Sequence, residues 1–249
     1  MPGTFNEPVT SELPNGYITG LTLSNDTDTE HDIAIAVGEC RDSADGTDMA
    51  RAAVLTKQID AAFAAGDDAG GMFTGAVANT TWYHVHLIKK DSDGTIDAGF
   101  DTSITAANIP AGYTEYRRIG SVLTNGAANI LNFIQVGDIF RWKTSILDIS
   151  LANMIVAKTS YVISVPLGLK VLAWGNFAQP GNTRVQISSP DDTDGAPSAT
   201  ASPLCITTIV DATKWMSLTN ASSQISLQPH ATTAGYLTTE GYIDIRGRG

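Results

Sequence analysis

The stretch of residues 81–143 constrains the fold of this chain more than any other part of the sequence. In it, aromatic and aliphatic residues alternate with polar ones, and turn-forming residues interrupt the alternation at short intervals. The pattern predicts five consecutive strands, at residues 82–89, 95–101, 117–124, 130–136 and 139–143. The links between them are too short for crossover helices, so neighbouring strands are expected to be antiparallel.

Three short segments are expected to turn the chain within this stretch. Asp91-Ser-Asp-Gly94 separates the first two strands, and Gly137-Asp138 separates the last two. Asn125-Gly126 is the dipeptide that most readily takes the positive φ angles of a tight turn.

Similar alternation before and after this stretch predicts at least ten further short strands. The exception is residues 49–66, where Leu55, Ile59 and Phe63 recur at a spacing of four and Gly66 suits a helix end, so the periodicity predicts a short helix. The surrounding strands favour the alternative, a strand. Many strands with at most one short helix predict an all-β fold, an antiparallel β-sandwich or jelly roll.

The ends of the chain suggest a division into an arm and a head. Residues 1–16 contain three prolines and little periodicity, and are expected to form an N-terminal anchoring arm. Residues 17–249 are expected to form a β-rich head, either as one unit or as two packed parts, 17–144 and 145–249. The N-terminus lacks the basic and apolar regions of a secretory signal, so synthesis in a cytoplasm is expected.

Composition excludes several classes of function. The formal net charge of −11 argues against a nucleic-acid-binding face, which needs clustered Lys and Arg. No stretch approaches the ~20 apolar residues of a membrane span, so no membrane insertion is expected. Cys40 and Cys205 lie far apart and outside any metal or redox spacing, so both are expected to be free thiols.

Two groups of residues suggest metal ligands. In the loop of residues 38–48, Glu39, Asp42, Asp45 and Asp48 offer oxygen ligands to calcium, although the order of an EF-hand loop is missing. The alternative, which we favour, is a solvated loop whose aspartates cap turns. We therefore expect no cofactor, with calcium as the alternative.

His84 and His86 lie two residues apart on a predicted strand, within reach of one metal ion. The interpretation that we favour is that they are outward-facing polar residues on a strand whose inner face is Tyr83, Val85 and Leu87.

Catalytic motifs are missing from the sequence. It contains no GxSxG nucleophile elbow, Walker loop or GxGxxG motif, and a glycosidase carboxylate pair has no spacing signature. We expect no enzymatic activity.

A binding site is predicted instead around residues 110–112, where Tyr113, Tyr116 and Arg118 could contact sugar rings or anchor an interface. The alternative is that they plug the end of the sandwich. For Trp174, Trp215 and Tyr236, core packing is the favoured interpretation.

Parts of the sequence resemble a known group of proteins. Residues 70–90 (GGMFTGAVANTTWYHVHLIKK), residues 109–142 (IPAGYTEYRRIGSVLTNGAANILNFIQVGDIFRW) and the terminal GYIDIRG of residues 241–247 resemble bacteriophage and prophage virion proteins described as tail-fibre, tail-tip or other structural proteins. The resemblance covers most of residues 40–142 and is only general in residues 143–240.

The resemblance implies a virion component with a β-rich, trimeric binding head and without catalytic residues. Because only a short arm precedes the head, it favours a short spike or capsid-attached fibre, including the head spikes of phage-like gene transfer agents. The first hypothesis is a homo-oligomeric virion spike or fibre that binds host envelope or capsular polysaccharide, with its arm holding other virion proteins. The alternatives are a capsid decoration or tail connector protein without receptor binding, and a depolymerase.

Overall fold

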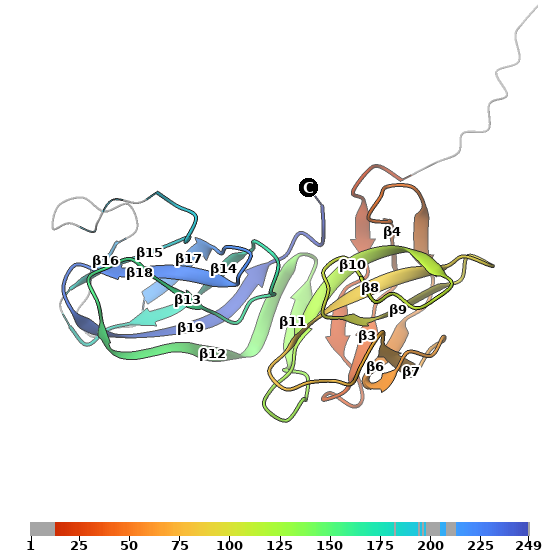
Figure 1. The fold of residues 1–249 in the computed structure, drawn as a ribbon, viewed down its shortest axis with the longest axis horizontal. Helices are drawn as coiled ribbons and strands as arrows, with labels where there is room; N and C mark the ends of the chain where they lie inside the picture. The colour runs from red at the N-terminus through yellow and green to blue at the C-terminus, as the bar shows by residue number, and fades with distance from the viewer. Residues whose placement is uncertain are drawn as a thin grey trace, which may run out of the picture.

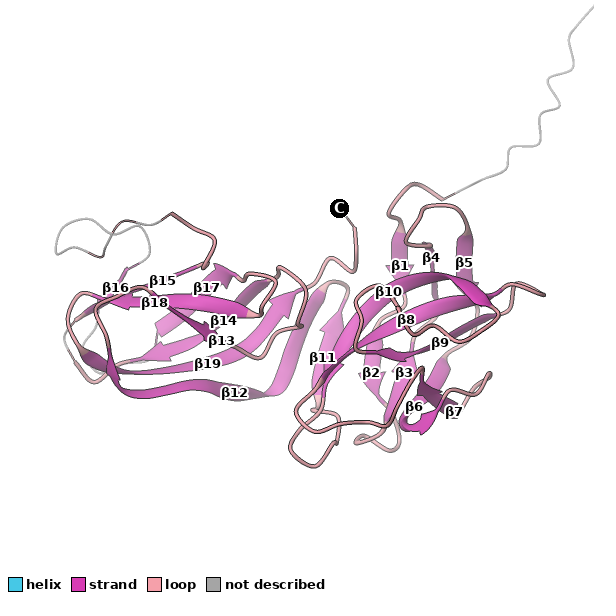
Figure 2. Ribbon diagram, in the orientation of Figure 1, coloured by secondary structure: helices cyan, strands magenta, loops and turns pink. Residues whose placement is uncertain are grey.

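All of the regular structure in the described residues is β-strand (Figures 1 and 2). The computed structural model describes residues 13–181, 183–193, 195, 197, 205–207 and 213–248, with the backbone alone at 205–207. Within these residues, nineteen strands form four sheets, so the predicted all-β class is confirmed. The part of the chain that is described contains no helix able to cross a membrane.

Two sheets make up the N-terminal unit. The smaller sheet is antiparallel and consists of β1 (Ile18–Gly20), β4 (Gly38–Arg41) and β5 (Asp48–Arg51). The larger sheet has the order β10 (Tyr113–Leu123), β8 (Trp82–Lys90), β9 (Ile96–Asp101), β7 (Ala69–Met72), β6 (Leu55–Ala62), β3 (Asp32–Ile35) and β2 (Leu23–Asn25). Cys40 and Met49 from the small sheet share one apolar core with Leu55 and Leu87 from the large sheet.

Two further sheets form the C-terminal unit, beside the first unit in Figure 1. The five-stranded sheet has the order β11 (Phe133–Val136), β12 (Ile139–Met154), β19 (Thr233–Ile243), β14 (Leu172–Ala178) and β17 (Thr213–Leu218). The four-stranded sheet has the order β13 (Thr159–Val162), β18 (Gln224–Pro229), β15 (Arg184–Ser188) and β16 (Cys205–Thr207). Both are antiparallel, and Phe177 and Leu237 from one pack in the same cluster as Val185 and Leu227 from the other.

The division between the units lies between β10 and β11, since these strands belong to different sheets. The boundary considered at residues 144 and 145 instead falls inside β12. Of the arm expected at residues 1–16, residues 1–12 lie outside the described residues.

The five strands predicted in residues 81–143 are confirmed as β8 to β12, and their mutual pairings are antiparallel. One turn forms differently from the expectation. Positive φ falls at Ala128 (66°) and not at Asn125 or Gly126. The Asn125 side chain accepts hydrogen bonds from the backbone N–H groups of Ala127 and Asn129, at 2.8 and 3.1 Å, so it turns the chain through its amide.

The helix predicted at residues 49–66 is wrong, because this segment forms β5 and β6. Leu55, Lys57 and Ile59 point to the core in strict alternation, and the lysine at the middle position hid that pattern. Its ammonium group is fully buried and donates hydrogen bonds to the carbonyl oxygens of Ala64 (2.7 Å) and Gly66 (3.1 Å).

The charge of Lys57 is balanced by Asp97 on β9, whose Oδ1 atom lies 3.2 Å from Nζ. Asp97 also accepts hydrogen bonds from the backbone N–H groups of Gly66 (2.8 Å) and Ala98 (2.7 Å). A buried ion pair needs such additional bonds to offset the cost of removing both charges from water.

The C-terminal segment, residues 244–248, joins the two units, and we call it the C-terminal clasp. After β19 it runs back to the N-terminal unit (Figure 1), where Asp244 accepts two hydrogen bonds from Arg118 of β10, at 2.7 and 2.5 Å. Arg246 donates to the carbonyl oxygen of Gly20 (2.7 Å), and Arg117 donates to the carbonyl oxygen of Arg246 (3.1 Å). The C-terminal clasp therefore contacts β1 and β10 of the N-terminal unit.

Replacing Asp97 with Ala is expected to lower the free energy of unfolding by about 3–5 kcal/mol, because Lys57 would remain buried and charged without its partner. Adding Lys57→Met to Asp97→Ala should recover much of that loss. Urea denaturation of the single and double variants measures both effects. A double variant no more stable than Asp97→Ala alone would show that the buried charge is not the cause.

Replacing Asp244 with Ala is expected to cost about 3–5 kcal/mol as well, since it leaves the buried Arg118 guanidinium unpaired. The matched control is Asp191→Ala, which removes an exposed ion pair with Lys170 at 2.7 Å and should cost at most ~1 kcal/mol. Thermal unfolding of both variants tests the clasp, and equal effects would contradict it.

Candidate functional site

The three residues predicted to bind sugars all lie on β10, but they do not share an exposed surface. Tyr113 is 7% exposed and its ring meets Phe63 edge-on, with centroids 5.5 Å apart. Arg118 is 5% exposed and engaged in the clasp, whereas Tyr116 is half-buried with its ring 5.7 Å from that of His86. The expected exposure is therefore wrong for Tyr113 and Arg118, and Tyr113 fits the alternative of internal packing.

His84 and His86 are also internal, so the favoured interpretation that they face solvent is wrong. His84 Nδ1 lies 2.8 Å from Ser121 Oγ, and His86 Nε2 donates to the carbonyl oxygen of Ser103 at 2.9 Å. The exposed fractions of the two histidines are 1% and 0%. Both faces of β8 are covered, which local alternation does not reveal.

Burial sets the protonation of this histidine pair. Desolvation, followed by the positive charge of Arg118, lowers the pKa of His84 to about 3. Desolvation lowers the pKa of His86 to about 4. Both rings are neutral at pH 7. Within the described residues, no group of three or more His, Cys, Asp or Glu side chains is arranged to hold a metal ion.

The acidic loop at residues 38–48 uses its carboxylates within the fold. Asp42 accepts hydrogen bonds from the backbone N–H groups of Ala44, Gly46 and Thr47, at 3.1, 2.6 and 2.7 Å. Asp48 pairs with Arg41 at 2.8 Å. The favoured interpretation, that an aspartate caps this turn, is confirmed for Asp42. A calcium ion in this loop would have to compete with these bonds.

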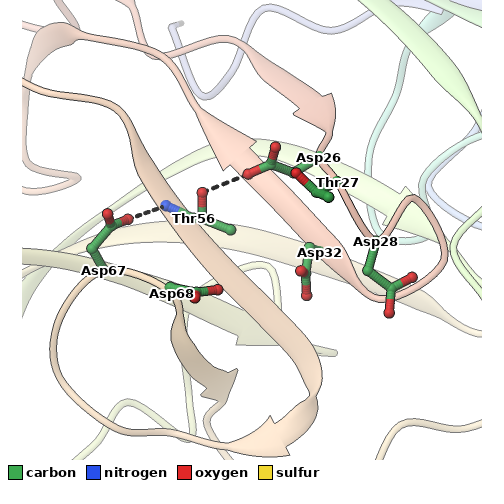
Figure 3. Close-up of a pocket in the computed structure, with 7 residues that line it drawn as sticks. All are labelled: Asp26, Thr27, Asp28, Asp32, Thr56, Asp67 and Asp68. Carbon is green, nitrogen blue, oxygen red and sulfur yellow. Dashed lines mark hydrogen bonds between the residues drawn. The ribbon is translucent and has the colours of Figure 1, made fainter.

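A second acidic group lines an open cavity of about 510 Å³ in the N-terminal unit (Figure 3). The cavity is lined by Asp26, Thr27, Asp28, Asp32, Thr56, Asp67 and Asp68. Asp26 and Asp67 each accept a hydrogen bond from Thr56, at 2.6 and 2.7 Å. Burial and the neighbouring carboxylates, Asp28 first among them, raise the pKa of Asp32. Sequence analysis missed this group because its aspartates come from two distant segments.

The most extensive exposed feature of the C-terminal unit is one face of the five-stranded sheet. Strand register places Val136, Ile139, Ile243, Leu172 and Leu218 in a row across all five strands. The next row contains Ile134, Arg141, Gly241, Trp174 and Met216. We call these two rows, with Leu147 and Tyr236 further along the sheet, the outer apolar face.

Side chains on the outer apolar face are accessible although they are hydrophobic. Seven of its members are between 42% and 67% exposed: Ile134, Val136, Ile139, Leu147, Met216, Leu218 and Tyr236. The opposite side of the same sheet carries Phe140, Leu237 and Tyr242, which are buried in the core. Core packing, expected for Trp174, Trp215 and Tyr236, is confirmed for Trp215 and wrong for Tyr236.

A polar group crosses the middle of the outer apolar face. Glu240 accepts hydrogen bonds from Asn176 (2.6 Å) and Lys214 (2.5 Å). The hydrogen bond from Lys214 is the main cause that lowers the pKa of Glu240. Glu240, Asn176 and Lys214 are thus hydrogen-bonded to one another within the face. The described residues do not cover the surrounding hydrophobic side chains.

The size of the outer apolar face distinguishes it from scattered surface hydrophobics. The two rows cross five strands ~4.8 Å apart and span about four residues of each strand with a rise of ~3.4 Å, which gives an area of roughly 300 Å². That area is within the range of the largest apolar patch found on ordinary monomers, about 300–600 Å². Patches of this size are often functional.

Comparisons with protein-family models, with curated proteins and with solved structures gave no match for this chain.

The buried histidines predict how stability depends on pH. An unfolded histidine has a pKa near 6.5, so below that pH the unfolded chain binds protons that the folded protein excludes. The contribution of His84 and His86 to the free energy of unfolding should be constant above about pH 6.5 and fall on acidification, by ~1.4 kcal/mol per pH unit for each histidine. Urea denaturation between about pH 4.5 and 7 should show this slope, and His84→Gln with His86→Gln should flatten it.

His31→Gln is the matched control for that experiment. A hydrogen bond to Asp28 raises the pKa of His31, so its contribution is present below pH ~6.5 and is lost as the pH rises. Replacing His31 should leave the fall in the free energy of unfolding on acidification unchanged or make it slightly steeper. An unchanged slope in the His84 and His86 variant would refute the assignment.

Proposed function

We propose that this chain is a structural subunit of a virion surface, a spike, fibre head or decoration protein that acts by binding and not by catalysis. The observation that carries the proposal is the outer apolar face. A chain that leaves a continuous hydrophobic patch of roughly 300 Å² uncovered on one sheet is suited to function within an assembly.

The positions of the residues that carry the resemblance to virion proteins support this proposal. Residues 70–90 and 109–142 contribute to β7, β8, β10, β11 and the start of β12. The third segment, residues 241–247, is the end of β19 and most of the C-terminal clasp. The Asp244 side chain in this third segment pairs with Arg118 in residues 109–142, so these two segments are in direct contact although they are distant in the sequence.

The placement of the reactive side chains favours binding over catalysis. Ser121 and His84 lie 2.8 Å apart, in hydrogen-bonding distance, but both are 1% exposed, which denies access to a substrate. Burial also raises the pKa of Cys40 to about 12, which keeps its thiol protonated. These groups stabilise the core.

The role of the assembled subunits follows from the same proposal. A homo-oligomer on a particle presents several copies of each weak site, so it binds host envelope or capsular polysaccharide with high avidity without one tight site. A decoration or connector role without receptor binding is the second candidate. The internal positions of Tyr113 and Arg118 favour it, because they remove two of the three predicted sugar contacts from the surface.

The two roles differ in one measurable property, the affinity for glycans. Receptor binding predicts saturable retention of the full chain on an array of purified capsular and envelope polysaccharides. Display on beads should raise the apparent affinity by about 10²–10⁴-fold. Tyr116→Ala, which changes the predicted sugar contact that keeps some exposure, should weaken retention, while Tyr161→Ala on β13 is the control. A folded oligomer that is retained by no polysaccharide would contradict receptor binding and favour the decoration role.

A further inference from the structure

Lys57 and Asp97 place an amine and a carboxyl group in contact in the interior of the N-terminal unit. Lys57 lies on β6 and Asp97 on β9, and β7 separates these strands in the seven-stranded sheet. The two residues are 0% and 2% exposed, and Asp97 Oδ1 lies 3.2 Å from Lys57 Nζ. Gly71 of β7 leaves room for the long side chain, because a β-carbon there would lie 3.2 Å from the Cβ atom of Lys57.

Backbone groups hold both side chains in one orientation. The Lys57 ammonium group donates two of its hydrogens to the carbonyl oxygens of Ala64 and Gly66, at 2.7 and 3.1 Å. Its third hydrogen is left for Asp97. The two carboxylate oxygens of Asp97 accept hydrogen bonds from the backbone N–H groups of Ala98 and Gly66, at 2.7 and 2.8 Å. The amine and the carboxyl group therefore face each other, and neither turns away without losing hydrogen bonds.

The surroundings of the pair favour uncharged groups. Desolvation lowers the pKa of Lys57, against the opposing effect of the Asp97 charge, so the neutral amine forms more readily than in water. The ring of Phe63 covers Nζ at 5.1 Å, and the ring of Tyr113 packs edge-on against Phe63 at 5.5 Å. These rings screen the pair from bulk water. A reaction that removes both charges would relieve the cost of burying them.

We propose that Lys57 and Asp97 condense to an isopeptide bond, an amide that joins β6 to β9 covalently. A proton first passes from the ammonium group to Oδ1, which leaves a neutral amine with its lone pair directed at a neutral carboxyl group. The Nζ–Cγ bond then forms and the Cγ–Oδ1 bond breaks. Oδ1 departs as water with two of the three ammonium hydrogens, and the third stays on the amide nitrogen. The two charges cancel, and the atoms balance without a co-reactant.

The fold supplies what the same reaction lacks between free groups in solution. Two groups that are held face to face react with an effective molarity of up to about 10⁵–10⁸ M. The backbone N–H of Gly66 lies 2.8 Å from Oδ2, where negative charge develops when the amine attacks, and it stabilises that charge. Oδ2 becomes the amide oxygen and keeps this hydrogen bond. The remaining amide N–H keeps one of the two carbonyl partners of the lysine.

The test is tryptic digestion of the denatured wild-type chain, after the folded protein has been kept at neutral pH for several days, followed by mass spectrometry. An amide at Lys57 blocks cleavage after that residue. The expected product is a branched peptide in which residues 52–90 are joined to residues 91–117, lighter by one water molecule than the two linear peptides together. Fragmentation of this peptide should place the branch at Lys57 and Asp97.

The matched control within the same digest is Lys170 with Asp191. Their side chains form an ion pair at 2.7 Å, shorter than the buried pair, but they are 65% and 48% exposed. Water solvates both groups, so trypsin should cleave after Lys170 and give only linear peptides there. A Lys57→Arg variant keeps the positive charge without a primary amine, and its residues 91–117 should be recovered as a linear peptide.

Complete cleavage after Lys57 in the wild-type chain, with residues 91–117 found only as a linear peptide, would overturn the inference and leave an ion pair only. This measurement decides the matter even if Lys57→Arg fails to fold. The inference goes beyond the proposed function and does not rest on it, so a linear digest would leave that function unaffected. Chains with Asp97→Ala, alone or with Lys57→Met, cannot form the amide, so the comparison between them still measures the buried charge.

Discussion

The bidentate pair between Arg118 and Asp244 is the buried charge pair that joins the two units, beside the hydrogen bond from the backbone N–H of Leu23 to Gln135 and the contact between the Trp82 and Trp142 rings. Both side chains are almost fully buried, and 126 residues separate them in the sequence. Burial would raise the pKa of Asp244, but the hydrogen bonds and charge of Arg118 lower it below its ordinary value. The carboxylate therefore stays ionised, and its partner is satisfied only when the end of β19 is in place. A contact so distant in sequence makes the N-terminal unit incomplete without the last residues of the chain.

Buried polar side chains with specific backbone partners recur throughout the N-terminal unit. Lys57 donates to two carbonyl groups beside Asp97, Arg117 donates to the carbonyl of Arg246, and His86 donates to that of Ser103. Each bond ties a strand to a loop or to the clasp, and each would leave a costly unsatisfied group if the loop moved. Irregular chain that these hydrogen bonds hold in place thus covers part of the central strands, which explains why polar residues occupy interior positions of β6, β8 and β10.

Local pattern predicted the strands of residues 81–143 because their turns are encoded by neighbouring residues, Gly94 and Gly137 among them, which take φ angles of 72° and 58°. It failed where the environment is set from far away. Lys57 interrupts the apolar alternation between Leu55 and Ile59, so the sequence shows a spacing of four, which is typical of a helix. The sequence gives no sign of the clasp or of the loop after β9. Local pattern therefore predicts exposed positions for His84, His86, Tyr113 and Arg118. The acidic cavity was missed for the same reason, since Asp26 and Asp68 meet only in the folded sheet.

The outer apolar face shows a different limit of sequence analysis. In strands such as β11 and β14, hydrophobic residues occupy both faces, a pattern typical of strands buried on both sides. The sequence therefore signals that the second face is covered, but it does not say by what. In the described chain the other sheet of the unit covers only the inner side, and the assembly proposed above would account for the pattern. Selection for solubility acts on the assembled protein, and a strand that is exposed in one chain can keep the composition of an interior strand if a partner always covers it.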